Sequence, residues 1–150
     1  MRMLQKKSKY AIRALLALAQ RPEQEPVLIA DLAAQERIPK KFLEFILLVL
    51  RNKGILQSKR GRGGGYFLGR KPEAISLGEV IRALDGPLAP VPCVSHTAYR
   101  KCDECEDELT CGIRAVMNDV RDATAAIFDR ESLADILRRI AKLQGEKKPQ

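Results

Sequence analysis

Five residues near the middle of the chain, Gly61-Arg62-Gly63-Gly64-Gly65, constrain its fold more than any other segment. Glycine adopts positive φ readily and weakens the interior of helices and strands, so four glycines in five positions predict a tight turn. Strand-like runs flank the turn, at residues 55–60 before it and 66–68 after it. The segment is therefore predicted to be a β-hairpin with a basic, glycine-rich tip.

The residues before this hairpin predict three helices. Residues 6–20 and 29–36 carry apolar side chains at helical spacing, and residues 40–53 form an apolar run that ends in basic residues before Gly54. Arg37-Ile38-Pro39 separates the second helix from the third by a turn short enough for a helix-turn-helix. A hairpin directly after such a helix pair is typical of a wing, so the chain predicts a winged helix-turn-helix domain.

A glycine-rich basic loop is also used to bind nucleotide phosphates. A dinucleotide fingerprint that starts at Gly61 requires glycine at position 66, where the chain has Tyr66, and no Gly-Lys-Ser/Thr follows for a P-loop. An ordinary exposed hairpin is the remaining alternative if the hairpin is considered alone. The preceding helices favour DNA binding over both alternatives.

The charge distribution supports a polyanionic partner. The chain has a formal net charge of +8, and 17 of its 27 Lys and Arg residues but 8 of its 19 Asp and Glu residues lie in residues 1–92. The positive charge therefore belongs to the predicted winged domain, although a basic surface also serves solubility.

Particular residues can be assigned to DNA contacts as hypotheses. If residues 40–52 enter the major groove, Glu44 is placed to accept a hydrogen bond from cytosine N4. Phe42 or Phe45 would contact a thymine methyl group, with core packing as the alternative for this apolar run. In the wing, Arg60 and Arg62 are predicted to enter the minor groove. The full predicted set of DNA contacts is Lys40, Lys41, Glu44, Lys59, Arg60, Arg62, Gly63 and Gly64.

The cysteines predict a second site. The first twenty residues resemble an export signal, but Arg13 interrupts the apolar stretch, so we expect a cytoplasmic chain with reduced thiols and no membrane span. Cys93, Cys102, Cys105 and Cys111 are therefore candidate metal or redox residues. Their spacing has one close pair, not the two of a zinc ribbon, so structural zinc is the weaker alternative. Four thiolates would complete a [2Fe–2S] or [4Fe–4S] cluster, which a purified sample can lack.

A long helix is predicted to begin at Gly112, with Thr110 as its N-cap. An apolar stripe runs along it at three- and four-residue intervals, and the polar side chains of Arg114, Asp119, Arg121 and Asp122 face away from the stripe. The stripe consists of Ile113, Val116, Met117, Val120, Ala123 and Ile127. Because this helix lies beyond a complete winged domain, we expect it to pair with its mate in a homodimer, and a short helix to follow it.

Several motifs together resemble the Rrf-two family of bacterial winged-helix regulators. The resemblance spans residues 1–140 and implies a homodimer that binds palindromic operators in double-stranded DNA, with an iron–sulfur cluster in many members. It implies that Glu44 is the recognition-helix glutamate and Arg60 the wing arginine. The chain departs from the family at Phe45, where glutamine is common, and at Arg114, where some members have histidine. The motifs are residues 9–14, 29–33, 42–44, 51–54, 60–66 and 75–81.

The sequence thus predicts a mainly α fold with three parts: a winged helix-turn-helix domain with a small β-hairpin wing (1–84), a cysteine-containing loop (85–111), and a long dimerisation helix with a short C-terminal helix (112–145). We expect a transcriptional regulator, for example a repressor, that senses cluster status, redox state or nitric oxide. One histidine and no recognisable triad argue against an enzyme with a small-molecule substrate. The alternative is a cluster-free regulator in sulfur metabolism, controlled by a partner protein or a thiol switch.

Overall fold

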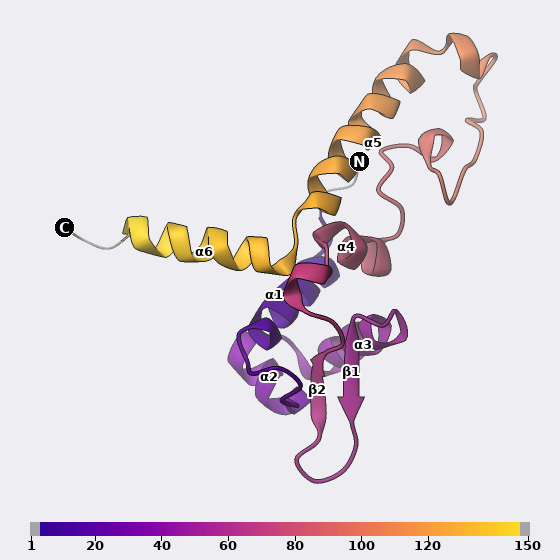
Figure 1. The fold of residues 1–150 in the computed structure, drawn as a ribbon. Helices are drawn as coiled ribbons and strands as arrows, with labels where there is room; N and C mark the ends of the chain where they lie inside the picture. Colours follow the sequence, from indigo (N-terminus) through magenta and orange to yellow (C-terminus); the bar gives the residue numbers. More distant parts are fainter. Residues whose placement is uncertain (1–3, 148–150) are drawn as a thin grey trace.

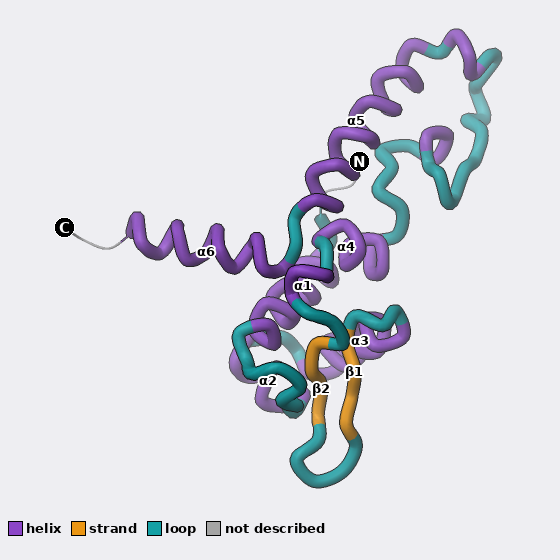
Figure 2. Tube along the Cα trace, viewed as in Figure 1, coloured by secondary structure: helices purple, strands orange, loops and turns teal. Residues whose placement is uncertain are grey.

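A computed structural model describes residues 4–147 of the protein (Figures 1 and 2). The described part is mainly helical with one antiparallel pair of strands, as predicted, and it also contains three short 3-10 turns. The helices are α1 (Lys6–Ala19), α2 (Ile29–Glu36), α3 (Lys40–Asn52), α4 (Leu77–Asp85), α5 (Gly112–Arg130) and α6 (Leu133–Lys147). The strands are β1 (Leu56–Lys59) and β2 (Gly65–Leu68), and the 3-10 turns are Pro72–Ala74, Pro92–Val94 and Glu108–Thr110.

Helices α1 to α4 and the hairpin pack around one apolar core. We call this part of the chain, residues 6–85, the winged domain. Helix α1 contributes Leu15 to this core and α3 contributes its whole inner face, all fully buried. The inner face of α3 consists of Leu43, Ile46, Leu47 and Leu50. Burial of these side chains fixes the orientation of α3, so the opposite face of α3 is held toward solvent.

The turn between α2 and α3 confirms the predicted helix-turn-helix. Arg37 has φ 55° in the left-handed region and ends α2, and Ile38 is buried while its amide donates to the carbonyl of Ala33 at 3.0 Å. At the other end of α3, Gly54 has φ 76°, as expected for glycine after a helix end.

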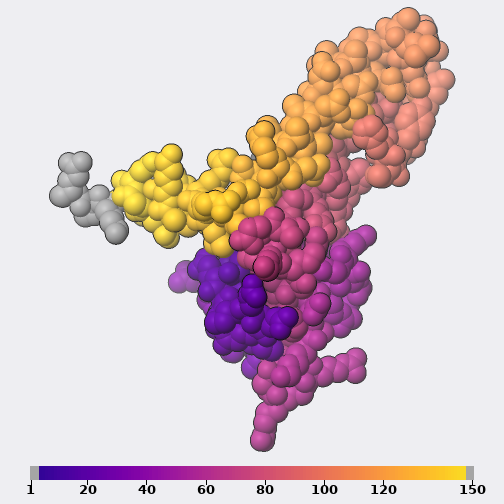
Figure 3. Space-filling model, in the orientation of Figure 1, coloured from indigo at the N-terminus to yellow at the C-terminus, as the bar shows by residue number. Residues whose placement is uncertain are grey.

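The hairpin confirms the predicted wing. Leu56 pairs with Leu68 and Lys59 pairs with Gly65, which leaves residues 60–64 as the tip. Gly61 and Gly63 have φ of 88° and 74°, a backbone conformation that favours glycine. The tip extends away from the rest of the domain (Figures 1 and 3).

Helix α5 and the cysteine loop form an arm that leaves the winged domain in one direction, while α6 leaves in another (Figures 1 and 3). None of the 19 residues of α5 is buried. The helix α6 has 15 residues and runs to Lys147, so it is longer than the predicted short helix. Within residues 4–147, no helix is long and apolar enough to cross a membrane.

The arm meets the winged domain at a joint between α4 and the start of α6. The amide of Leu77 donates to the carbonyl of Glu131 at 2.8 Å, and the amide of Leu133 donates to the carbonyl of Ile75 at 3.0 Å. The guanidinium of Arg82 forms two hydrogen bonds with the carboxylate of Asp129, at 2.6 and 2.9 Å. These bonds tie the end of α5 to α4.

Candidate nucleic-acid interface and cysteine site

The predicted DNA-contacting residues of α3 lie on its exposed face. Lys40, Lys41 and Glu44 are all exposed, because the opposite side of the helix is packed into the core. In the wing, the exposed residues are Lys59, Arg60, Arg62 and Gly63. The winged domain therefore presents an exposed helix face and an exposed basic hairpin tip.

Gly64 differs from the other predicted contacts because it is buried. Its amide donates to the carbonyl of Gly61 at 3.0 Å, and a Cβ at this position would lie 2.2 Å from the carbonyl oxygen of Lys59. Gly64 thus closes the tip of the hairpin, and its amide is already used within the turn.

The cations of this surface share a property that sequence alone does not reveal. In the part of the chain that the structure describes, none of them takes part in an ion pair, whereas the paired arginines lie outside α3 and the hairpin tip. The unpaired cations are Lys40, Lys41, Arg51, Lys53, Lys59, Arg60 and Arg62. Their charges are uncompensated and available to an anionic partner.

All four cysteines line one cavity of about 630 Å³ at the far end of the arm. Cys102 is exposed, and Cys93, Cys105 and Cys111 are partly buried; all four are free thiols. The structure therefore brings together the four residues that the sequence singled out. His96, the single histidine, does not line this cavity.

Local hydrogen bonds position two of the thiols. Cys111 is itself the N-cap of α5, and its Sγ accepts a hydrogen bond from the amide of Arg114 at 3.4 Å. The predicted cap Thr110 is therefore wrong by one position, because its hydroxyl is bonded to Asp107. The amide of Cys105 donates to the carbonyl of Cys102 at 3.1 Å, which makes residues 102–105 a turn.

Two arginines of α5 hold the cysteine loop against the helix. Arg114 Nε donates to the carbonyl of Cys93 at 3.3 Å, and Arg121 Nη1 donates to the carbonyl of Val94 at 2.6 Å. The side chain of Arg121 is 15% exposed, so this bond lies in a partly desolvated position. The sequence showed only that these arginines face away from the apolar stripe. Their partners are backbone carbonyls, which leave no mark in a sequence.

Burial and neighbouring groups raise the pKa of two side chains in the cysteine loop, Cys105 and Tyr99. Partial burial raises the pKa of the Cys105 thiol; the cation of Lys101 opposes this effect and the carboxylate of Glu108 adds to it. A hydrogen bond to Glu108 raises the pKa of the Tyr99 hydroxyl. Together these effects favour the neutral thiol of Cys105 over its thiolate.

The four cysteines are the candidate donors for a metal centre in the loop. Among residues 4–147, no three His, Cys, Asp or Glu side chains converge closely enough to hold one metal ion. Cysteine thiols are of the ligand type that iron–sulfur clusters take, and all four line the same cavity.

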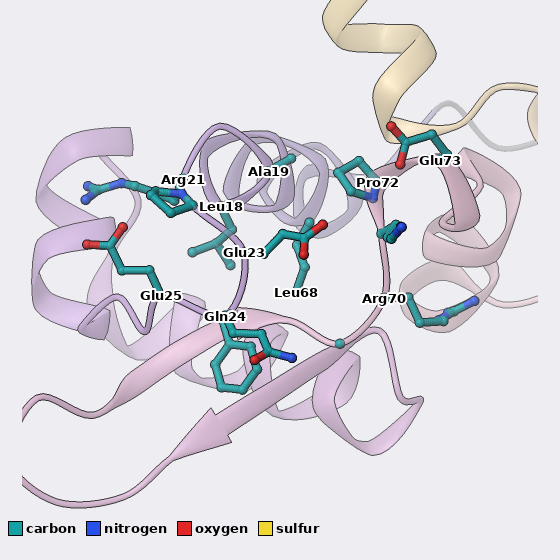
Figure 4. A pocket seen from close by; sticks show the side chains of 14 residues that line it. Leu18, Ala19, Arg21, Glu23, Gln24, Glu25, Leu68, Arg70, Pro72 and Glu73 are labelled. Carbon is teal, nitrogen blue, oxygen red and sulfur yellow. The ribbon is translucent and has the colours of Figure 1, made fainter.

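A second cavity, of about 380 Å³, lies in the winged domain behind the wing, between the end of α1, residues 21–25 and residues 67–73 (Figure 4). Its charged side chains have mixed sign, and Arg70 is paired with Glu79 outside it. None of the predicted site residues lines this cavity.

Comparison with known proteins identifies the family. Residues 4–139 match the family model Rrf2, described as an iron-dependent transcriptional regulator. An rrf2-like regulator from Rhodobacter capsulatus is 44% identical, covering 90% of this chain and 92% of its own. CymR from Bacillus subtilis is 31% identical (87% and 86% covered), and IscR from Escherichia coli is 32% identical (89% and 79%).

Solved structures agree with the sequence relatives. The structure of B. subtilis CymR, described as the global cysteine regulator, has a TM-score of 0.73 at 30% identity, covering 91% of this chain and 96% of its own. The structure of T. potens IscR has a TM-score of 0.73 at 26% identity, covering 99% and 93%. The fold, the exposed basic surface and these relatives lead to one conclusion: the chain belongs to the Rrf2 family of transcriptional regulators.

Proposed function

We propose that this regulator is a homodimer that binds a palindromic operator through α3 and the wing, and that it holds an iron–sulfur cluster in the cysteine loop. The observation that carries the DNA contacts is the set of seven unpaired cations on α3, its C-terminal end and the wing. In this arrangement Glu44 reads base edges from the middle of the exposed face, while the flanking lysines contact phosphates and position the helix. Arg60 and Arg62 reach the minor groove from the wing tip.

The homodimer is supported by the apolar stripe of α5. Ile113, Val116 and Ile127 are 74%, 56% and 51% exposed, although a helix of this kind gains most of its stability by packing an apolar face. A second copy of the chain, which offers the same stripe, would bury both stripes at once. Two winged domains related by a two-fold axis then meet two half-sites of a palindrome.

The cluster would be held by Cys93, Cys102, Cys105 and Cys111. When bound, it would supply a redox- and nitric-oxide-sensitive centre between these four thiolates. The side chains of this protein position the cysteine loop relative to the winged domain. Arg114 and Arg121 bond the loop to α5, and the Arg82–Asp129 pair bonds α5 to α4. A rearrangement of the loop is thereby linked to the winged domain through a continuous series of bonds.

The DNA contacts are tested by measuring the affinity for a labelled duplex over a salt series. Arg60→Ala and Arg62→Ala should each reduce the slope of log K against log salt by about 0.9 if each guanidinium in the minor groove displaces one counterion from the duplex. Arg130→Ala, which removes an exposed arginine at the end of α5, is the matched control and should keep the slope. An unchanged slope in both wing variants would refute the wing assignment.

The cluster is tested by purifying the protein without oxygen and counting iron and sulfide per chain. Cys105→Ala should abolish both, and His96→Ala, in the same loop, should leave both unchanged. Cys102→Ala separates a four-thiolate site from a three-thiolate site, because only the former needs the exposed Cys102. Absence of iron and sulfide in the wild-type protein would rule out the cluster.

A thiol switch is the second candidate, favoured by the turn at Cys102 to Cys105. A turn closed by such a hydrogen bond brings the two Cα atoms within about 7 Å, which is the range that a disulfide bridges. A hydroperoxide would transfer one oxygen to one thiolate, giving a sulfenic acid and an alcohol. The second thiol would then displace hydroxide from that sulfur and close the disulfide, with water as the final product.

This alternative is measured on metal-free protein. After treatment with a hydroperoxide, two of the four thiols should be lost, and the peptide that contains both cysteines should lose the mass of two hydrogens. Cys102→Ala should prevent the loss and Cys93→Ala should not. Persistence of all four thiols would exclude this switch.

A further inference from the structure

Helix α3 exposes two apolar side chains in the middle of its polar face. Phe45 is 52% exposed and Leu48 is 43% exposed, although four other apolar residues of the same helix are completely buried. Because a helix turns 100° per residue, Phe45 and Leu48 share one face with Lys41, Glu44 and Asn52. This face of α3 does not pack into the core, because it lies on the side of the helix opposite its buried residues.

The aromatic side chain of Phe42 is used differently. Its ring packs edge-on against Tyr10, with ring centres 5.6 Å apart and planes at 80°, and Lys6 and Arg13 lie over the Tyr10 ring. Phe42 thus belongs to a cluster that joins α3 to α1. Within the described residues, Phe45 has no such aromatic or cation contact, so its exposed surface is available to a ligand.

The surrounding charge indicates which ligand fits these two side chains. Lys40 and Lys41 lie at the start of α3, Arg51 and Lys53 at its end, and all four are exposed and unpaired. Phe45 and Leu48 therefore lie between two groups of unpaired cations. This arrangement suits the DNA major groove, because the phosphates that line its two edges can contact the cations while the apolar side chains face the bases. The apolar group on the floor of that groove is the 5-methyl of thymine.

We propose that Phe45 and Leu48 select thymine in the operator by packing against its 5-methyl group. The inference rests on the proposed placement of α3 in the major groove and adds a reading rule to it. Glu44, on the same face, accepts a hydrogen bond from cytosine, and the apolar pair accepts thymine beside it. The two kinds of contact together distinguish neighbouring base pairs.

Replacement of thymine by deoxyuridine tests this rule, because deoxyuridine lacks only the methyl group. Selection from a randomised duplex pool first supplies a bound sequence, and each thymine in it is then replaced in turn. At one or more positions the wild-type affinity should fall about three- to fivefold, as expected for one methyl-sized group returned to water. Phe45→Ala or Leu48→Ala should bind the thymine and deoxyuridine duplexes equally at that position.

Three controls keep the result specific. Leu143→Ala, which removes an exposed leucine of α6, should keep the wild-type discrimination. Far-UV circular dichroism and thermal melting check the fold of each variant, and Phe45→Leu, which stays apolar, serves if Phe45→Ala unfolds. The salt-dependent affinity for the unselected pool is measured in parallel, so that loss of DNA binding as such is recognised.

Several outcomes would overturn the rule. Discrimination that persists in both alanine variants, or a selected sequence in which no thymine methyl matters, would refute methyl reading while salt-dependent DNA binding stands. A change in sedimentation mass in Phe45→Ala, without a change in the thymine to deoxyuridine ratio, would make this patch a protein interface. No retention of any duplex at low salt would refute the DNA contacts and the reading rule together.

Discussion

The winged domain and the arm are stabilised in opposite ways. The winged domain supplies all the large, fully buried side chains except Val94 and Leu133. The arm, by contrast, contains a 19-residue helix with no buried residue and a cysteine loop held by arginine bonds to backbone carbonyls. The winged domain therefore has a core of its own, whereas the arm depends on the groups that it contacts.

This difference separates the two tasks of the molecule. A domain with its own core can present α3 and the wing in a fixed geometry, which base reading requires. An arm with little core can change its arrangement at low cost, as the proposed sensing and dimerisation require. Among the described residues, the end of the arm is bonded to the winged domain at the joint, where Arg82 pairs with Asp129.

The largest effect should come from the core of the winged domain. Leu47→Ala removes a side chain that is fully buried in α3 and should lower the free energy of unfolding by about 2–5 kcal/mol. Urea denaturation followed by circular dichroism measures this loss. Leu143→Ala, at a position that is 63% exposed, should change it little. Equal losses in the two variants would contradict the assignment of the core.

The arm should respond through assembly instead of unfolding. Val116→Asp places a carboxylate in the exposed apolar stripe and should weaken the dimer at least about tenfold, because a buried unpaired charge is costly. Sedimentation over a concentration series measures the dissociation constant. Ala115→Asp, one residue and 100° away on the same helix, is the matched control. A dimer weakened equally by both substitutions would show that the stripe is not the interface.

The sequence predicted the winged domain better than the arm because its signals are local. Glycines at positive φ and helical periodicity act over a few residues, so the wing and the helix-turn-helix were found where they were predicted. The bonds of Arg114 and Arg121 join residues 21 and 27 positions apart, and no pattern in the chain encodes them. Thr110 was predicted to cap α5 by its hydroxyl, but Asp107 takes that hydroxyl and the thiol of Cys111 caps instead.

A similar limit applies to the candidate sites. The sequence identified the cysteines, and the structure gathers them around one cavity. It could not distinguish Phe42 from Phe45, because both lie in one apolar run, and only packing against Tyr10 separates them. The burial of Gly64 within the tip likewise depends on the folded hairpin, and the sequence does not show it.

A substitution at the joint should lower the stability of the fold by a moderate amount. Ser132 caps α6, because its hydroxyl accepts from the amide of Asp135 at 3.1 Å while the carboxylate of Asp135 accepts from the amide of Ser132 at 2.9 Å. Ser132→Ala removes half of this reciprocal cap and should cost about 1 kcal/mol. Thermal melting measures the loss, and Thr97→Ala, exposed in the cysteine loop, should melt like the wild type. No change in Ser132→Ala would show that the cap does not stabilise the joint.

The smallest effect should be the pH dependence of the Arg82–Asp129 pair. Hydrogen bonds from Arg82 lower the pKa of the Asp129 carboxyl below its value in the unfolded chain. The pair therefore stabilises the fold at pH values above the ordinary aspartate pKa of about 4, and this contribution is lost as the pH falls through the lowered value. Because both side chains are more than 40% exposed, we expect the pair to contribute less than about 1 kcal/mol to the free energy of unfolding at neutral pH.

Asp129→Asn should be slightly less stable than the wild type at pH 7, and urea denaturation should show the difference shrinking toward pH 3. Asp119→Asn, at an exposed position of α5 without an ion pair, should show no such convergence. A difference between Asp129→Asn and the wild type that stays constant over this range would mean that the pair does not stabilise the joint through its charge.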